Sequence, residues 1–410
     1  MTISNPQALA CRECGARYPV EPRSICDGCF GPVEPWYDLD AIDGGLFRKH
    51  VEAGPQTLWR YEQLLPGGPD VPRVDLGAGF TPLRRARRLG ERLGIRRLWV
   101  KDDSVNPSNS FKDRVVSVAS TMARAFGFEA LSCASTGNLA NAVGAHAAAA
   151  GIPAYVFVPE DLEQAKILAT EAYGAKVVAV EGNYDDVNRL CSEVAEALPW
   201  AFVNVNMRPY YAEGSKSLGF ELAEQLGWRL PDHVVVPIAS GALMTKVHRA
   251  FRELVAIGAV EDKPYRISGA QAAGCAPVAR AWAEGSEDVR PVKPDTIARS
   301  LAIGNPADGY YAIRTAKATG GVIEACEEAE VVEGIRLLAE TEGVFTETAG
   351  GVTVAVLRRL REAGAIDPDE ETVALVTGNG YKTVEALEGV VRPTYRVPPD
   401  LDAFLAALRG

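Results

Sequence analysis

The sequence has no run of about 18 apolar residues, which is the length that a helix needs to cross a bilayer. The Ala-rich stretch 140–150 comes nearest, but it is too short and contains His146. The first ten residues carry neither the basic segment nor the apolar segment of a secretory signal. We therefore expect a cytoplasmic protein that has no membrane partner.

An excess of basic residues is also missing. Lys and Arg number 43 against 54 Asp and Glu, so the formal net charge is −11. Because contacts to nucleic-acid phosphates need clustered Lys and Arg, we expect no nucleic-acid partner. Histidine is scarce, with four residues in 410, and none stands in a setting typical of a catalytic triad. We expect His146, in an Ala-rich helical stretch, to pack rather than to catalyse.

After about residue 40 the sequence alternates short apolar runs with helical segments. The length of 410 residues suggests two or three domains. Apolar runs separated by helices are typical of parallel βαβ units, so the sequence predicts an α/β fold. Ligands of such sheets bind in the loops that follow the carboxyl ends of the strands. The predicted strands are 98–101, 130–135, 154–159, 176–182, 202–206, 233–240, 265–270 and 372–378. The clearest predicted helices are 138–150, 162–173, 184–198, 213–227 and 242–257.

Lys112 stands in the first loop that could carry chemistry, 106–114, with the sequence NPSNSFKDR. Ser110 is a candidate N-cap for the following helix, which places Lys112 in the first helical turn. The helix dipole disfavours a cation there and so favours the neutral amine that imine chemistry needs. Taken alone, the segment is more often a solvated, charged helix start.

Three further strand-to-helix loops combine hydroxyls, glycine and small residues. They are CASTGN at 133–138, ASGALMT at 239–245 and TGNGYK at 377–382. Such residues at a helix N-terminus leave backbone N–H groups free to bind an anion. The loop at 239–245 is neither a P-loop nor a GxGxxG motif, because its spacing is wrong for both. Each loop alone is more often an ordinary cap or tight turn.

In this order, the four loops resemble those of the pyridoxal 5'-phosphate (PLP) enzymes of the tryptophan-synthase β type (fold type II), and within them the threonine synthases. The likeness rests on SFKDR, STGN, SGAL and TGNG, together with EGSKS at 213–217 and ETAGG at 347–351. It covers residues 75–390 and implies PLP as the cofactor. The implied fold has two doubly wound α/β domains, a large one of 37–122 and 211–410 and a small one of 123–210.

The resemblance implies a role for each matching residue. Lys112 would hold the cofactor covalently and later move protons. Asn138 would hydrogen-bond the phenolic oxygen of the cofactor, and Thr377 would meet its pyridine nitrogen. The substrate carboxylate would face Ser135, Thr136 and Gly137. The cofactor phosphate would lie against the backbone amides of Ser240, Gly241, Ala242, Leu243 and Met244.

The implied activity is the conversion of O-phosphohomoserine and water to L-threonine and phosphate by a homodimeric enzyme with a small amino-acid substrate. The sequence departs from the threonine synthase pattern at Leu139, where many members have Thr, and at Tyr211, where many have Arg. Asn206 and Arg208 could bind the substrate phosphate instead, and Lys216 is another cation nearby.

Because of these departures, other activities stay open. A β-replacement enzyme such as cysteate synthase, acting on O-phosphoserine, and a lyase of the threonine dehydratase type both share the implied fold. A binding protein with an inactive cofactor site is a further alternative, which the presence of Lys112 and Asn138 disfavours.

The segment 1–36 differs from the rest, because it holds four of the eight cysteines. Cys11 and Cys14 form one CxxC unit, and Cys26 and Cys29 form a second after 11 intervening residues. Four thiolates at this spacing are typical of a zinc ribbon, and four protein ligands leave no open position for catalysis. We predict a structural Zn²⁺ ion; a pair of disulfides and a metal-free remnant are the alternatives.

Overall fold

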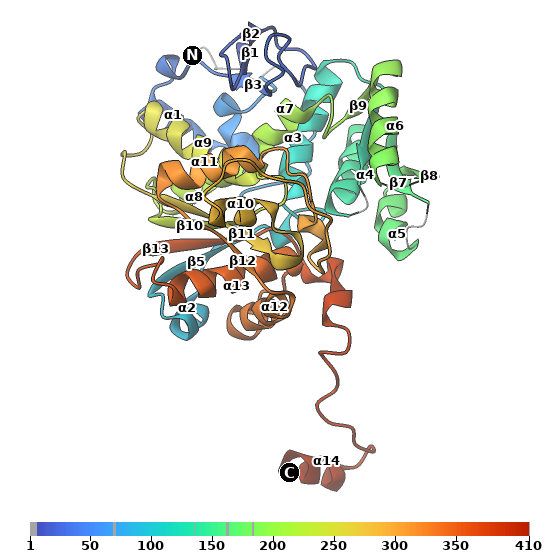
Figure 1. Ribbon diagram of the computed structural model, residues 1–410, viewed down its shortest axis with the longest axis vertical. Helices are drawn as coiled ribbons and strands as arrows, with labels where there is room; N and C mark the ends of the chain where they lie inside the picture. Colours follow the sequence, from blue (N-terminus) through green and yellow to red (C-terminus); the bar gives the residue numbers. More distant parts are fainter. Residues whose placement is uncertain (1–5, 69–70, 136, 161–163, 183, 410) are drawn as a thin grey trace.

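The computed structural model describes residues 6–68, 71–135, 137–160, 164–182 and 184–409. The predicted α/β fold is confirmed, since strands and helices alternate through most of the chain. Figure 1 shows a main body, a smaller lobe beside it and a short N-terminal sheet on top. Thr136, one of the predicted site residues, lies outside the described residues.

The main body is built on a six-stranded sheet in the order β12-β11-β10-β13-β5-β4. Its strands are parallel, except that β4 runs antiparallel to β5. Leu98 of β5 pairs with Thr372 of β13, so segments far apart in the sequence are neighbours within this sheet. The strands are β4 (Leu83–Arg85), β5 (Arg97–Asp102), β10 (His233–Pro237), β11 (Arg266–Ala272), β12 (Ile323–Cys326) and β13 (Glu371–Val376).

Both faces of this sheet are buried, because helices cover each of them. Val234 and Val236 of β10 pack into one core with α8 (Lys216–Gln225) and α9 (Ala242–Ala256). Val235 packs into a second core with α2 (Arg87–Leu93), α12 (Glu328–Glu342) and α13 (Thr348–Glu362). Successive residues of a strand face opposite sides, so a strand covered on both sides is apolar at every position.

The smaller lobe is a four-stranded parallel sheet in the order β8-β7-β6-β9. Its strands are β6 (Ala130–Ala134), β7 (Ala154–Pro159), β8 (Lys176–Val180) and β9 (Trp200–Phe202). Its helices are α4 (Asn138–Ala150), α5 (Gln164–Ala172) and α6 (Tyr184–Ala197). The helix α3 (Lys112–Ala125) contacts both α4 and α7 (Arg208–Gly214), so it joins the lobe to the main body.

The N-terminal sheet is antiparallel and has the order β2-β1-β3. Its strands are β1 (Ala8–Cys11), β2 (Arg17–Tyr18) and β3 (Val33–Trp36), and β3 contacts α7. The other helices of the main body are α1 (Gly44–Ala53), α10 (Pro277–Ala283) and α11 (Gly309–Thr319).

Most predicted elements are confirmed, and two are wrong. The predicted strand 154–159 and helix 138–150 coincide with β7 and α4. The predicted strand 202–206 is wrong: β9 ends at Phe202, because Asn206 accepts from the Phe202 N–H at 2.9 Å and donates to the Trp200 carbonyl at 3.0 Å. The predicted helix 213–227 is instead two helices, α7 and α8, which meet at Ser215.

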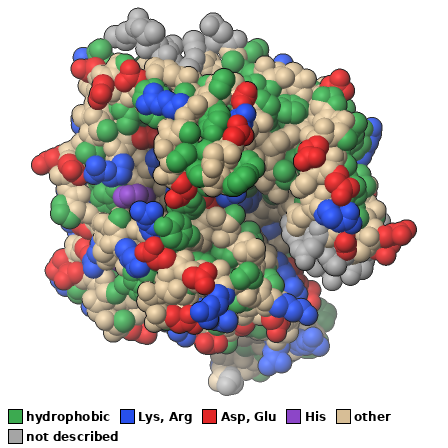
Figure 2. Space-filling model, turned by 45° about the horizontal axis from the view of Figure 1, so that its top comes forward, with side chains coloured by type: hydrophobic (Ala, Val, Ile, Leu, Met, Phe, Trp, Pro, Cys, Tyr) green, Lys and Arg blue, Asp and Glu red, His purple; other side chains and the backbone are tan. Residues whose placement is uncertain are grey.

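Beyond residue 388 an exposed segment leads to the last helix, α14 (Leu401–Arg409). Figure 1 shows this helix standing away from the main body. Among the described residues, no helix is both long and apolar enough to span a bilayer. Figure 2 shows acidic and basic side chains interspersed among the coloured residues of one face of the molecule.

Candidate active site

Lys112 is the first residue of α3, as the sequence predicts. Its Nζ donates a hydrogen bond of 2.9 Å to the hydroxyl of Tyr211, which α7 supplies. The same Nζ lies 5.5 Å from the centre of the Tyr211 ring and 5.6 Å from that of Phe111. Phe111, not Ser110, occupies the cap position of α3, but the Ser110 hydroxyl still accepts from the Lys112 N–H at 3.3 Å. The lysine is half-buried, so its amine remains reachable.

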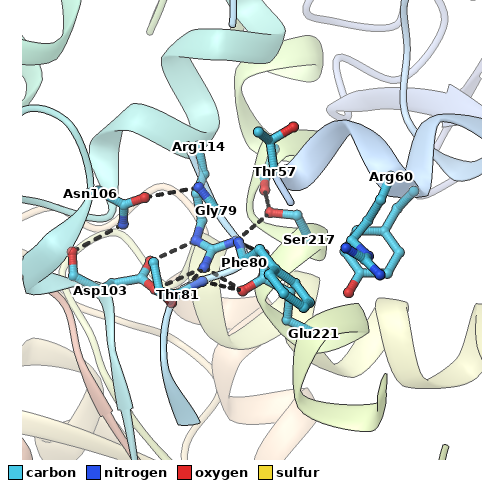
Figure 3. Close-up of polar contacts among 12 residues, drawn as sticks. Thr57, Arg60, Gly79, Phe80, Thr81, Asp103, Asn106, Arg114, Ser217 and Glu221 are labelled. Atoms are coloured by element: carbon cyan, nitrogen blue, oxygen red, sulfur yellow. Dashed lines mark hydrogen bonds and ion pairs between the residues drawn. The ribbon is translucent and has the colours of Figure 1, made fainter. Parts of the chain in front are cut away.

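A buried network of charges fixes the start of α3 (Figure 3). Arg114 Nε lies 2.6 Å from Asp103 Oδ2, and its Nη2 lies 2.7 Å from Glu221 Oε2 on α8. Lys101 of β5 adds a second cation 2.6 Å from Glu221 Oε2. Burial alone would raise the pKa of Glu221, but Arg114 and Lys101 outweigh it and lower the pKa to about 2. Glu221 is therefore ionised, and the network ties the start of the lysine-bearing helix to the sheet and to α8.

Glu347 connects two of the predicted site residues. Asn138, at the start of α4, donates from Nδ2 to Glu347 Oε2 at 2.8 Å. The Thr377 side chain, just after β13, also lies close enough to the Glu347 carboxylate to favour its ionised form. The Glu347 backbone N–H donates to the Gly378 carbonyl at 3.0 Å. The structure thus brings Asn138 and Thr377 to one carboxylate, although they lie far apart in the sequence.

Glu347 was not among the predicted site residues, although it begins the ETAGG segment that contributes to the resemblance. Burial raises the pKa of its carboxyl group above the ordinary value of 4.5. The Asn138 amide and the charges of Lys382 and Lys112 oppose that shift only in part. A buried carboxyl group with a raised pKa beside a lysine is typical of a functional site.

The loop at 239–245 forms a tight turn that begins α9. Gly241 has a φ of +96°, and a Cβ atom there would lie 2.5 Å from the Asp308 carbonyl oxygen. Only glycine fits without strain, because both the left-handed φ and the close backbone oppose a side chain. The first N–H groups of a helix have no partner within it, so this turn offers donors to an anion. The predicted residues Ala242, Leu243 and Met244 form the first turn of α9, and the Met244 side chain is buried in the core.

The loop before α4 is more open. The Gly137 N–H lies 3.5 Å from the Ser135 hydroxyl, and Gly137 is exposed. Asn138 begins the helix, and the side chain of Leu139 is buried. Ser135 and Gly137 therefore border accessible space at the N-terminus of a 13-residue helix.

The three candidates for the substrate phosphate differ in what they already bind. Asn206 uses its amide to bond the backbone of β9. Lys216 is fully buried against Glu213, at 2.7 Å, and Glu253. Arg208 pairs with Asp308 at 2.9 Å, and its side chain is 36% exposed. Of these three side chains, that of Arg208 is therefore the most accessible to a substrate phosphate.

The residues around Lys112, Asn138, Thr377 and Gly241 could hold PLP, the cofactor that the sequence resemblance implies. A half-buried lysine amine can carry an aldehyde group, and the amides at the start of a 15-residue helix can bind a phosphate. Amide and hydroxyl groups, here Asn138 and Thr377, can meet the polar edges of a pyridine ring. The glycine turn leaves room for close approach to the backbone, which a Cβ at Gly241 would remove.

A second cluster lies in the N-terminal sheet. The sulfur atoms of Cys11, Cys14, Cys26 and Cys29 all lie within 4.8 Å of one another and could hold a metal ion. They are free thiols, with 3.5 Å between Cys11 and Cys29 and 3.6 Å between Cys14 and Cys26. The Tyr18 hydroxyl, 3.0 Å from Cys26 Sγ, and the backbone N–H groups of Cys29 and Gly28 lower the pKa of the Cys26 thiol to about 6, which favours a thiolate at this position.

Comparison with known proteins identifies the family. The family model described as "Pyridoxal-phosphate dependent enzyme" matches residues 74–378. The threonine synthase of Methanocaldococcus jannaschii is 34% identical over 402 residues, covering 97% of this chain and 98% of the relative. The threonine synthase of Methanosarcina acetivorans is 34% identical over 409 residues, covering 98% of each.

A solved structure supports the fold. The processed form of threonine deaminase isoform 2 from Solanum lycopersicum matches with a TM-score of 0.63 at 22% identity, covering 84% of this chain and 87% of that one. The chain therefore belongs to the pyridoxal-phosphate-dependent enzymes of fold type II, in the threonine synthase group.

Proposed function

We propose that this enzyme converts O-phosphohomoserine and water to L-threonine and phosphate, with PLP bound to Lys112. The observation that carries the proposal is the Lys112 amine, which lies half-buried at a helix start and bonded to Tyr211. The likeness to threonine synthases over nearly the whole chain supports the same activity.

We propose the following positions for the cofactor. Lys112 holds its aldehyde carbon, Asn138 donates to its phenolic oxygen and Thr377 meets its pyridine nitrogen. Its phosphate accepts hydrogen bonds from the backbone of Ser240, Gly241, Ala242, Leu243 and Met244. The bound cofactor stabilises the carbanions formed on the substrate, and the protein supplies orientation and proton transfer.

The substrate is held by groups on two lobes. Ser135 and Gly137, with Thr136 by sequence, bind its carboxylate at the start of α4. Arg208 binds its phosphate, because a guanidinium donates two parallel bonds to phosphate oxygens. Arg208 stands three residues before Tyr211 on α7, so the two side chains share one face of that helix. We leave Asn206 out of this site, since both ends of its amide bond the backbone.

Proton transfer falls to Lys112 and Tyr211. The free Lys112 amine would take the Cα proton and then a Cβ proton, and phosphate would leave from Cγ. It would return one of these protons to Cγ and, after water adds at Cβ, the other to Cα, while the remaining proton of the water would go to the phosphate. The Tyr211 hydroxyl, 2.9 Å from Lys112 Nζ, holds the amine in place and exchanges a proton with it.

A product assay tests this proposal. The purified enzyme, with its visible cofactor absorbance recorded, is offered O-phosphohomoserine, and O-phosphoserine with and without sulfite, and phosphate and amino-acid products are measured. Threonine formed only from O-phosphohomoserine is the expected result, and Lys112→Ala should lose both the visible band and turnover. Cysteate formed from O-phosphoserine and sulfite would favour the β-replacement alternative, which Leu139 and Tyr211 leave open.

We also propose that the four clustered cysteines bind a structural Zn²⁺ ion. Their spacing, the closeness of their sulfurs and the backbone N–H groups of Glu13 and Gly28, each 3.4 Å from a cysteine sulfur, support a tetrathiolate site. Metal analysis of the purified protein tests this. About one zinc per chain is expected, and a zinc-free wild-type protein would contradict it.

Three coarser features complete the proposal. We propose a homodimer and a cytoplasmic location, by likeness to the family; light scattering and fractionation of cells test them. We propose domain boundaries near residues 36, 122 and 210. The strands of the six-stranded sheet lie within residues 83–102 and 233–376, whereas those of the four-stranded sheet lie within 130–202. This separation supports the boundaries. Expression of residues 123–210 alone tests the inner two boundaries, and a fragment that folds by circular dichroism is the expected result.

A further inference from the structure

Asp308 links three parts of the molecule. It occupies the cap position of α11, but its carboxylate makes no cap hydrogen bond there. Instead, Oδ1 accepts from Arg12 Nη1 at 3.1 Å and Oδ2 accepts from Arg208 Nη2 at 2.9 Å. An aspartate at a helix cap usually bonds the first turn of its own helix. Here the carboxylate is bound by arginines from the N-terminal sheet and from α7.

The backbone of Asp308 touches the proposed phosphate turn. Its N–H donates to the Ser240 carbonyl at 2.8 Å. Its carbonyl oxygen would lie only 2.5 Å from a Cβ at Gly241, so the two backbones are in contact. A displacement of Asp308 therefore displaces the turn that begins α9.

The N-terminal sheet holds Arg12 firmly. The Arg12 guanidinium lies 3.6 Å from the centre of the Tyr311 ring of α11, and Glu13 bonds the Tyr311 hydroxyl. Glu34 of β3 lies 3.5 Å from Arg12 Nη1 and pairs with Lys246 of α9 at 2.9 Å. The N-terminal sheet thus contacts α9 and α11, the two helices whose N-termini meet at the phosphate turn.

Arg12 also changes the charge around that turn. The Asp308 side chain is only 8% exposed, so its negative charge is poorly screened by water. Removing Arg12 would leave Arg208 as its one described cationic partner, and Arg208 is also proposed to bind the substrate. A carboxylate that is less well neutralised would oppose a phosphate nearby, and it would be less well held in place.

We propose that Arg12 is a positioning residue for the cofactor phosphate, acting through Asp308 on the Ser240–Gly241 turn. The N-terminal cysteine sheet is then part of the apparatus that sets affinity for a phosphorylated cofactor. This inference rests on the proposed function, because it takes the turn at 240–244 as the phosphate site.

The test compares two cofactors that differ only in the phosphate. The full-length enzyme, freed of cofactor, is titrated with PLP and with pyridoxal, and dissociation constants are read from the visible absorbance. For Arg12→Met the constant for PLP should rise about tenfold, equivalent to about 1.4 kcal/mol. The constant for pyridoxal should change less than about twofold, because pyridoxal lacks the group that the turn binds. Arg12→Lys should recover most of the PLP affinity, since it keeps the cation.

Arg23→Met is the matched control. Arg23 lies in the same segment and also stacks on a tyrosine, Tyr18, at 4.4 Å, but it pairs with Glu21 and Asp27. Its PLP affinity should equal that of the wild type. Circular dichroism and the thermal midpoint of each variant show whether it is folded.

Three outcomes would overturn the inference. If the folded Arg12→Met enzyme binds PLP as tightly as the wild type, Arg12 does not influence the phosphate turn. An equal loss for PLP and pyridoxal shows a general structural defect rather than an effect on the phosphate. A wild-type enzyme that binds both cofactors equally well overturns the phosphate turn itself, and with it this inference; that result is recognised without any variant.

Discussion

Replacing Arg114 by methionine should destabilise the protein strongly. Arg114 is fully buried and contacts the carboxylates of Asp103 and Glu221, both also fully buried. Methionine keeps most of the volume of the side chain but removes its charge and its five donors. Two buried carboxylates would then share the single cation of Lys101, which lies 2.6 Å from Glu221.

The expected loss in the free energy of unfolding follows from removing one partner of a buried ion pair. Such changes cost about 3–5 kcal/mol, because they leave an uncompensated charge in the interior. Arg114→Lys should lose less, since it keeps the charge but cannot bond two carboxylates at once. Because Glu221 has its pKa lowered to about 2 in the folded state, its contribution is complete above the ordinary value of 4.5. That contribution disappears as the pH falls towards 2, so the difference between wild type and variant should shrink in acid.

Urea unfolding, followed by circular dichroism at pH 7 and at several lower pH values, measures this prediction. Arg336→Met is the matched control, because Arg336 is 53% exposed and pairs with Glu340, which is 57% exposed. The control should change the free energy of unfolding by no more than about 0.5 kcal/mol. A loss below about 1 kcal/mol in Arg114→Met would refute the view that this network holds the start of α3.

Three further substitutions test the candidate active site, and a fourth tests the cysteine cluster. Gly241→Ala should raise the PLP dissociation constant at least about tenfold in an absorbance titration, because its Cβ would meet the Asp308 carbonyl; unchanged affinity would place the phosphate elsewhere. Tyr211→Phe should keep the visible cofactor band but lower kcat by about 10- to 100-fold and alter its pH profile, whereas a wild-type profile would exclude proton exchange through this hydroxyl. Burial raises the pKa of Glu347, so its ionisation costs stability as the pH rises above 4.5. The urea midpoint of Glu347→Gln should therefore rise relative to that of the wild type as the pH increases from about 4 to about 7. A difference between the two midpoints that does not change with pH would contradict this. Cys14→Ser should lose bound zinc in metal analysis while saturating PLP still gives the visible band; full retention of zinc would argue against the tetrathiolate site.

The sequence predicted the α/β fold because the strand signal is local. The run 154–159 is apolar at nearly every position, as a strand covered on both faces must be, and it forms β7 without change at either end. Lys112 was predicted in a first helical turn from the turn-forming residues before it, and α3 begins at that residue. Gly241 stood out for the same reason, because small residues after a strong strand signal a tight turn.

Local signals failed where side chains reach back to the backbone. The stretch 203–206 alternates apolar and polar residues, but the Asn206 amide bonds the backbone of Phe202 and Trp200 and bends the chain. No periodicity separates a short strand from such a turn.

Local sequence patterns could not predict the contacts between residues that lie far apart in the chain. Glu347 meets Asn138 across 209 positions, and Lys112 meets Tyr211 across 99. Arg114 resembled an ordinary charged residue at a helix start, although it is the centre of a buried network. These partners depend on how the two lobes and the sheet pack, which no local pattern encodes.

The pairing of β5 with β13 constrains the order in which the enzyme can be made. β5 ends at Asp102, while β13 begins at Glu371, so a ribosome adding about 5–20 residues per second needs tens of seconds between them. During that interval the smaller lobe, whose strands all lie within 130–202, can already form as it emerges. β5 and β10 meanwhile each expose an edge that only the last strand covers. A nascent or truncated chain that stops before β13 would thus present two open strand edges to its neighbours, and both edges are covered only when synthesis is nearly complete.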